Sequence, residues 1–229
     1  ISFTTSFQTF KYFELEDAID PKSYVQMSRG EYNVNPTHKY RFVIPKTVEL
    51  IRPIISKIDL PLYYEGKENE ITNEDKIKND KLLFFLVNLT ITSLTAYFTY
   101  CFIKDLGLGK FNSLIGGSLF LSIRYIVLST SIPIVDSLQY FAVILYSIFL
   151  LNNQTIKLSL VLPLMIISKE TMIPLIFLPL INSSLNRKFI ILSILISILF
   201  LIFVRQQIYS PSDQLSINLL ENIMIHFDK

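Results

Sequence analysis

The feature that most constrains this chain is residues 82–103, a run of 22 residues without a charged side chain. A helix needs about 20 predominantly apolar residues to cross the hydrocarbon core of a bilayer. Four further apolar runs follow, each with few charges, at residues 113–130, 134–151, 156–181 and 189–204. The sequence therefore predicts an all-α, polytopic transmembrane helix bundle of about five membrane segments.

The charged residues are concentrated before this bundle. Residues 1–81 carry 25 of the 40 Lys, Arg, Asp and Glu side chains, while 51% of the whole chain is hydrophobic. We expect three regions: a polar juxtamembrane, extracytoplasmic loop region at 1–81, the bundle at 82–204, and a polar tail at 205–229. The start at Ile1 and the mixed tail lead us to expect a piece of a longer protein. A net charge of only +2, with both signs intermixed, argues against a nucleic-acid partner.

Two helices are predicted within the polar region. In the first, Asp20 suits the N-cap, Pro21 the first helical position and Gly30 the C-terminal stop. The second covers residues 45–58, where one face collects Val48, Ile51, Ile55 and Ile58. An amphipathic segment with basic residues just before a membrane run is typical of a helix in the bilayer interface.

The fourth membrane segment, 156–181, has two alternative structures because it contains Lys169 and Glu170 near its middle. As a single span it buries both charges, at about 2.5–3.5 kcal/mol each, against about 0.3–0.6 kcal/mol gained for each of its many aliphatic residues. The other structure is a re-entrant hairpin of two short helices that meet at residues 168–171. The distribution of Lys and Arg fits either membrane orientation equally well, so it does not choose between them.

Asp17, Asp20 and Tyr24 are spaced by three and four residues and share one face of a helix. One interpretation is a carboxylate base or metal ligand at the membrane surface. The other is an N-cap at Asp20 and an ordinary solvated acid at Asp17. No cofactor follows from these residues beyond a divalent metal ion on the two acids.

His38, Lys39 and Arg41 bring two cations and a titratable imidazole together among aromatic residues. Such a group is suited to holding a phosphate or pyrophosphate near the headgroups. The competing interpretation is a basic patch that meets anionic lipid.

Ionisable residues inside the membrane segments are the remaining candidates. We expect Arg124 to face the bundle interior and form a structural ion pair with Asp136. Lys169 and Glu170 point about 100° apart on a helix, so each needs another partner or water. They are candidates for a substrate contact, a lipid-phosphate contact or a proton relay.

The order of these features resembles a known family. The residues that carry the resemblance are Asp17-Ala18-Ile19-Asp20-Pro21-Lys22-Ser23-Tyr24, His38-Lys39-Tyr40-Arg41-Phe42-Val43-Ile44-Pro45, Pro133-Ile134-Val135-Asp136 and Ser168-Lys169-Glu170-Thr171. They are similar to segments of bacterial polytopic membrane proteins related to GT-C-type glycosyltransferases. In that superfamily, the first extracytoplasmic loop carries an acidic catalytic residue, and the bundle accepts a polyprenyl-phosphate sugar in an outer cavity.

The resemblance implies a role for each candidate. Asp17 or Asp20 matches the catalytic loop acid, with Tyr24, His38, Lys39 and Arg41 near the donor phosphate and Lys169 and Glu170 lining the same cavity. It also implies the bacterial inner membrane, membrane lipid and a polyprenyl-phosphate-linked sugar as partners, an outward-facing polar region and the hairpin form of the fourth segment.

Two other classes of protein fit the same residues. A transporter or flippase subunit would use Lys169 and Glu170 in a polar pathway at the membrane midplane, between intact helices. A structural subunit would leave the candidate charges in separate places. The enzyme requires the loop residues and Lys169-Glu170 to meet on one side of the membrane, so the spatial arrangement separates the three classes.

Overall fold

We analysed a computed structural model that describes residues 2–15, 18–34, 36–39, 41–58 and 73–208. The regular elements in these ranges are all helices. In chain order they are α1 (Ser2–Tyr12), α2 (Ile19–Ser28), α3 (Pro36–Lys39), α4 (Val43–Ile55), α5 (Asn73–Asp105), α6 (Gly109–Ser122), α7 (Arg124–Ser131), α8 (Asp136–Leu151), α9 (Thr155–Ser168), the 3₁₀ helix η2 (Glu170–Leu180) and α10 (Arg187–Ile208).

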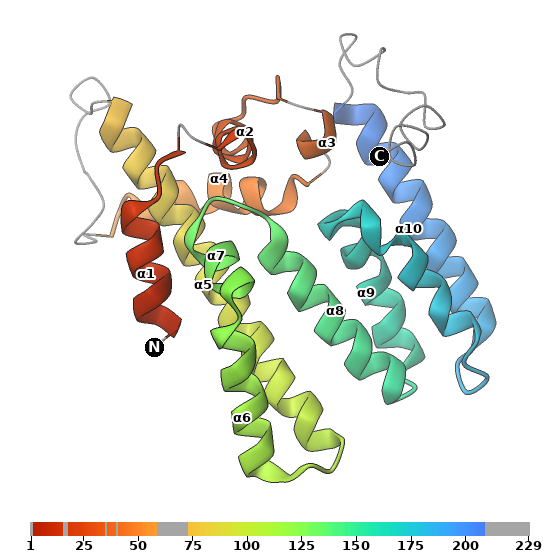
Figure 1. Ribbon diagram of the computed structural model, residues 1–229. Helices are drawn as coiled ribbons and strands as arrows, with labels where there is room; N and C mark the ends of the chain where they lie inside the picture. Colours follow the sequence, from red (N-terminus) through yellow and green to blue (C-terminus); the bar gives the residue numbers. More distant parts are fainter. Residues whose placement is uncertain (1, 16–17, 35, 40, 59–72, 209–229) are drawn as a thin grey trace, which may run out of the picture.

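The long helices lie side by side, and three short ones cover one end of them (Figure 1). Helix α5 packs against α6, α7 and α8, and α9 packs between α8 and α10. Helices α2, α3 and α4 lie together at the end of the bundle where α5 begins, and α4 contacts α5 directly. We call these three helices, residues 19–55, the cap.

Two helices are long and apolar enough to cross a membrane, over Lys76–Asp105 and Arg187–Val204. Helices α6 and α7 reach that length only together, and they are bent by 60° at their junction. The apolar helices α8 and α9 are shorter, with 16 and 14 residues. By length and composition the described chain thus has two spans, or three if the bent pair is one span, rather than five.

The fourth predicted segment is broken at Lys169. Helix α9 ends at Ser168, Lys169 is extended with φ −166° and ψ 132°, and η2 follows as a 3₁₀ helix. The side-chain amide of Asn182, just after η2, donates to the side-chain oxygen of Asn153, just before α9, at 2.9 Å. The segment is therefore a hairpin with Lys169 at its tip. Pro174 helps to explain the break, because its ring would clash with the carbonyl of residue 170 in a continuous α-helix.

The first predicted cap helix begins two residues earlier than its sequence pattern suggests, at Ile19 instead of Pro21. The N-cap of α2 is Ala18, and Asp20 lies within the first turn, so the prediction of Asp20 as the N-cap is wrong. Its carboxylate is thereby free to pair elsewhere. The stop at Gly30 is confirmed: Gly30 follows the last turn with φ 84°, a left-handed conformation that glycine adopts without steric cost.

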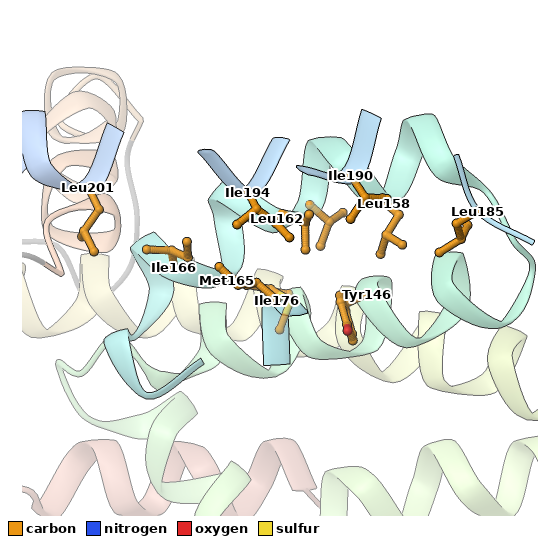
Figure 2. Packing of buried hydrophobic residues seen from close by; sticks show 12 residues of the cluster. Tyr146, Leu158, Leu162, Met165, Ile166, Ile176, Leu185, Ile190, Ile194 and Leu201 are labelled. Atoms are coloured by element: carbon orange, nitrogen blue, oxygen red, sulfur yellow. The ribbon is translucent and has the colours of Figure 1, made fainter. Parts of the chain in front are cut away.

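Two apolar cores hold the bundle and the cap. The first joins α8, α9, η2 and α10, and Figure 2 shows its side chains between these helices, among them Leu158, Leu162, Met165 and Ile190, each fully buried. The second joins the cap to α5 and the start of α8 through Tyr24, Met27, Val48 and Phe84. Because the cap shares a core with the bundle, its polar residues are held in register with the helix ends below it.

Candidate functional site

The cap contributes a chain of polar contacts that begins at Asp20. Its carboxylate pairs with Nε2 of His38 at 3.0 Å, and the imidazole lies against the Tyr24 ring with 5.3 Å between ring centroids. The Arg41 guanidinium donates to the Tyr24 hydroxyl at 3.3 Å. Helix α2 supplies Asp20 and Tyr24 from one face, so four of the predicted site residues meet in one cluster.

Burial and charge both alter the titration of this cluster. Burial raises the pKa of Tyr24 to about 12; Arg41 opposes this effect, and the carboxylates of Asp20 and Asp136 add to it. Burial lowers the pKa of His38 below its ordinary 6.5, although the Asp20 carboxylate opposes the change. His38 is therefore neutral at pH 7.

The hydrogen bond to Asp20 assigns the imidazole proton of neutral His38 to Nε2. The other nitrogen, Nδ1, is buried and has no hydrogen-bond partner within the described structure. It is the basic nitrogen of this tautomer. An Asp20–His38 pair with its basic nitrogen unpartnered has the chemistry of a general base.

A second cluster lies where α8 begins. The Lys169 ammonium, at the tip of the hairpin, pairs with Oδ1 of Asp136 at 3.0 Å, and the Tyr125 hydroxyl donates to Oδ2 at 3.4 Å. The side chains of Lys169 and Asp136 are 24% and 12% exposed. Asp136 is in the first turn of α8, where the helix dipole also favours a negative charge.

Asn88 of α5 holds the turn that leads into Asp136. Its amide nitrogen donates to the carbonyls of Ile132 and Ile134 at 3.3 and 3.0 Å, and its amide oxygen accepts from the Ser137 hydroxyl at 2.6 Å. Asn88 is fully buried. These three hydrogen bonds therefore hold the residues that flank Asp136 in position.

The two clusters are neighbours, since Val135 and Leu138, on either side of Asp136, pack in the same apolar core as Tyr24. Asp20, Tyr24, His38, Arg41 and Lys169 are thus brought to the same end of the bundle.

The remaining predicted residues have different outcomes. Lys39 is buried in the cap, with 2% of its surface exposed. Asp17 lies outside the described residues, as does the side chain of Glu170, whose backbone begins η2.

The predicted pair between Arg124 and Asp136 is wrong. Arg124 begins α7 with an exposed side chain, and Asp136 binds Lys169 instead. The bend between α6 and α7 explains why Arg124 is not the partner, because Tyr125, the next residue, is the one that reaches Asp136. Sequence spacing could not reveal a partner 33 residues away on the hairpin.

A third polar centre attaches the cap to α5 and was not predicted. The Asp80 side chain is 5% exposed and accepts from Nε of Arg29 and from Nη2 of Arg52, both at 2.6 Å. The Ser28 hydroxyl also accepts from Arg52, at 3.2 Å. The charges around Asp80 in the sequence do not distinguish it from its neighbours, so its role could not be predicted. Asn88, in contrast, is a large polar residue inside a charge-free run, and that position could have marked it as a structural residue.

The metal expected on Asp17 and Asp20 stays a prediction, because Asp17 lies outside the described residues. No group of three or more His, Cys, Asp and Glu side chains that could hold a metal ion occurs among them. The carboxylate of Asp20 is directed to His38.

Comparison with known proteins does not add a relative. No protein-family model, curated protein or solved structure matches this chain. The function is therefore argued from the geometry of the site itself.

Proposed function

We propose that this chain is an integral membrane, glycosyltransferase-like protein of the bacterial inner membrane that transfers a sugar from a polyprenyl-phosphate donor at the outer face. The observation that carries the proposal is that the Asp20–His38–Tyr24–Arg41 chain and the Asp136–Lys169 pair lie at the same, capped end of an apolar bundle. Such a reaction requires a base for the acceptor hydroxyl and positive charge for the departing lipid phosphate.

The residues divide into these two roles. Neutral His38, oriented by Asp20, is the base: its Nδ1 is buried in the described structure, so it accepts the proton of the acceptor hydroxyl once the cap opens to admit the acceptor. Arg41 and Lys169 stabilise the negative charge that develops on the departing phosphate. Asp136 holds the Lys169 ammonium in place. The apolar outer surface of the bundle suits a polyprenyl chain, which is itself apolar.

The depth of the Asp136–Lys169 pair supports an enzyme over a transporter. Asn88, which holds the turn before Asp136, is six residues into the charge-free run 82–103, or about 9 Å along α5 at 1.5 Å per residue. The whole run is about 33 Å long, so its midplane is about 16 Å from the edge. A pair on the capped side of the midplane, at a hairpin tip, fits a site that is open to the cap better than a central pathway between intact helices.

In this proposal all five predicted segments are embedded in the membrane, with η2 as the returning limb of a re-entrant hairpin. Irregular backbone at that depth is tolerated where it packs against protein, and η2 does so on one side through Ile176, while Phe177 and Leu178 are exposed. Tyr146 of α8 donates to the carbonyl of Leu175 in η2 at 2.7 Å, which gives one backbone carbonyl of this limb a hydrogen-bond partner in α8.

The test is sugar transfer by the purified chain in phospholipid, with a polyprenyl-phosphate sugar as donor. We expect transfer by the wild type and a loss of at least a hundredfold in His38→Gln, Asp20→Asn and Lys169→Met, with folding retained by circular dichroism. Lys188→Met is the matched control because Lys188 is an exposed lysine at the opposite end of the hairpin region. Transfer at the wild-type rate in His38→Gln and Lys169→Met would refute the proposed roles.

A further inference from the structure

Apart from Ile58, the apolar face of α4 that the sequence points to is not available to a membrane. Ile44 and Val48 are 1% and 0% exposed, and Ile51 and Ile55 pack against the same core of the cap and α5. This face of the helix is used inside the protein. Any contact of α4 with lipid must come from a different set of side chains.

Such a set lies on the outer side of the helix, beside the face that enters the core. Leu50 and Ile54 are 63% and 59% exposed, and Ile58, in the turn after α4, is 47% exposed. Leu50 is about 200° from Val48 around the helix axis, because each residue turns by about 100°. Helix α4 therefore has an inner apolar face in the core and an outer one, the Leu50–Ile54–Ile58 stripe, with no protein against it in the described structure.

The ion pair of α4 with α5 gives the height of this stripe. Arg52 is held to Asp80 at 2.6 Å, and Asp80 lies two residues before the charge-free run 82–103. At 1.5 Å per residue, Asp80 is about 3 Å outside the edge of that run. The run itself is about 33 Å long, close to the thickness of a hydrocarbon core. Helix α4 therefore lies at the level where hydrocarbon gives way to headgroups.

The charges beside the stripe suit a headgroup layer. Lys46 and Lys57 are both exposed on the outer side of α4 or just after it. Lys46 is bound to Glu49 at 2.7 Å, so among the described residues Lys57 supplies the positive charge next to the stripe. Apolar residues that penetrate the interface, flanked by lysine, are the pattern by which amphipathic helices bind anionic lipid.

We propose that the Leu50–Ile54–Ile58 stripe is a membrane-contact surface that inserts into the interface of an anionic bilayer, with Lys57 at the headgroups. The cap would then be attached on two sides, to α5 through its inner face and to lipid through its outer face. The proposal does not depend on the reaction that the site performs.

Tryptophan fluorescence tests this surface directly, because the chain contains no Trp. Leu50→Trp and Ile54→Trp each add a single fluorophore to the full chain, reconstituted in phosphatidylglycerol–phosphatidylcholine vesicles with brominated acyl chains. We expect a blue-shifted emission and at least twofold quenching relative to unbrominated vesicles. Lys22→Trp is the control, at an exposed position of α2 in the same cap. Quenching of Leu50→Trp and Ile54→Trp no greater than that of Lys22→Trp would overturn the proposal.

Two further variants separate lipid from other occupants. Adding Lys57→Glu to Ile54→Trp should reduce the quenching in vesicles that contain phosphatidylglycerol and leave it unchanged in pure phosphatidylcholine. If Lys57→Glu left the quenching unchanged in the phosphatidylglycerol vesicles as well, the anionic-lipid part of the proposal would be wrong. Ile54→Cys in a Cys101→Ser background tests for a second copy of the chain, since Cys101 is the single native cysteine. Efficient disulfide cross-linking between copies through Cys at position 54 would assign the stripe to a protein interface and contradict the proposal.

Discussion

Lys169 and Asp136 form an ion pair at 3.0 Å that joins the tip of the α9–η2 hairpin to the first turn of α8. The pair brings together two charges that lie in different apolar segments of the sequence. It gives Lys169 the partner that its neighbour Glu170 could not supply from the adjacent position of a helix. It also places a cation beside the cap without leaving it unpaired in an apolar environment.

Removing both sides of this pair should destabilise the fold by less than the sum of removing each side alone. Lys169→Met leaves the mostly buried Asp136 carboxylate with only Tyr125, and we expect a loss of about 2–3 kcal/mol in the free energy of unfolding. The double variant Asp136→Asn/Lys169→Met should lose less than the sum of the two single variants. Chemical denaturation in detergent measures this cycle. Strictly additive losses would mean that the two side chains do not interact.

Asn88 should be sensitive to substitution although it carries no charge. Asn88→Ala removes the donor to the carbonyls of Ile132 and Ile134 and the acceptor for Ser137, and buried groups without partners cost about 1–3 kcal/mol each. We expect a loss of about 2–4 kcal/mol in stability. The control is Asn112→Ala: Asn112 is exposed and bonds only to the carbonyl of Leu108 in its own turn. Losses of equal size in the two variants would refute the role of Asn88.

Asp80→Asn should loosen the cap from the bundle. The substitution keeps the shape but removes the charge that both Arg29 and Arg52 bind. We expect a loss of about 2–3 kcal/mol in the free energy of unfolding. This is less than for a fully buried network, because the two guanidinium groups are about one-third exposed. Proteolysis of the cap should become faster in parallel. The control is Asp105→Asn, because Asp105 is an exposed acid at the other end of α5; it should change neither the free energy of unfolding nor the rate of proteolysis.

The fold should become less stable on mild acidification through His38. Because burial lowers the pKa of His38 below 6.5 in the folded state, the unfolded chain binds a proton first as the pH falls. This contribution to stability is complete above pH 6.5, is lost as the pH falls below 6.5, and stops changing below the folded pKa. The thermal midpoint measured from pH 7.5 to 5.5 should fall more steeply in the wild type than in His38→Gln. Parallel curves for the two proteins would contradict the neutral, buried histidine.

Parts of this arrangement are predictable from residue patterns alone. The charge-free run at 82–103 lies within the longest helix, because a stretch of that length without charges has few alternatives to a membrane span. Gly30 ends α2 because its left-handed conformation is a local property. Lys169 is a break point in the fourth segment, as one of the two predicted alternatives requires.

The site depends on information that is not local. Asp20 pairs with His38 instead of capping its helix because the cap folds α3 back onto α2. Asp136 pairs with Lys169 although Arg124 is nearer in the sequence. The bend between α6 and α7 leaves Arg124 exposed, while the hairpin tip lies against α8. Periodicity identifies Val48, Ile51 and Ile55 as an apolar face of α4, but it could not say that this face packs against the core shared with α5 instead of the bilayer interface.

The sequence by itself determined that this chain is helical and apolar enough to cross a membrane, because those properties follow from the composition and length of continuous segments. Only the tertiary structure decided which charges meet. The partner of a buried ion is set by the packing of helices that are distant in the chain, and a carboxylate takes the cation that this packing brings within about 3–4 Å of it.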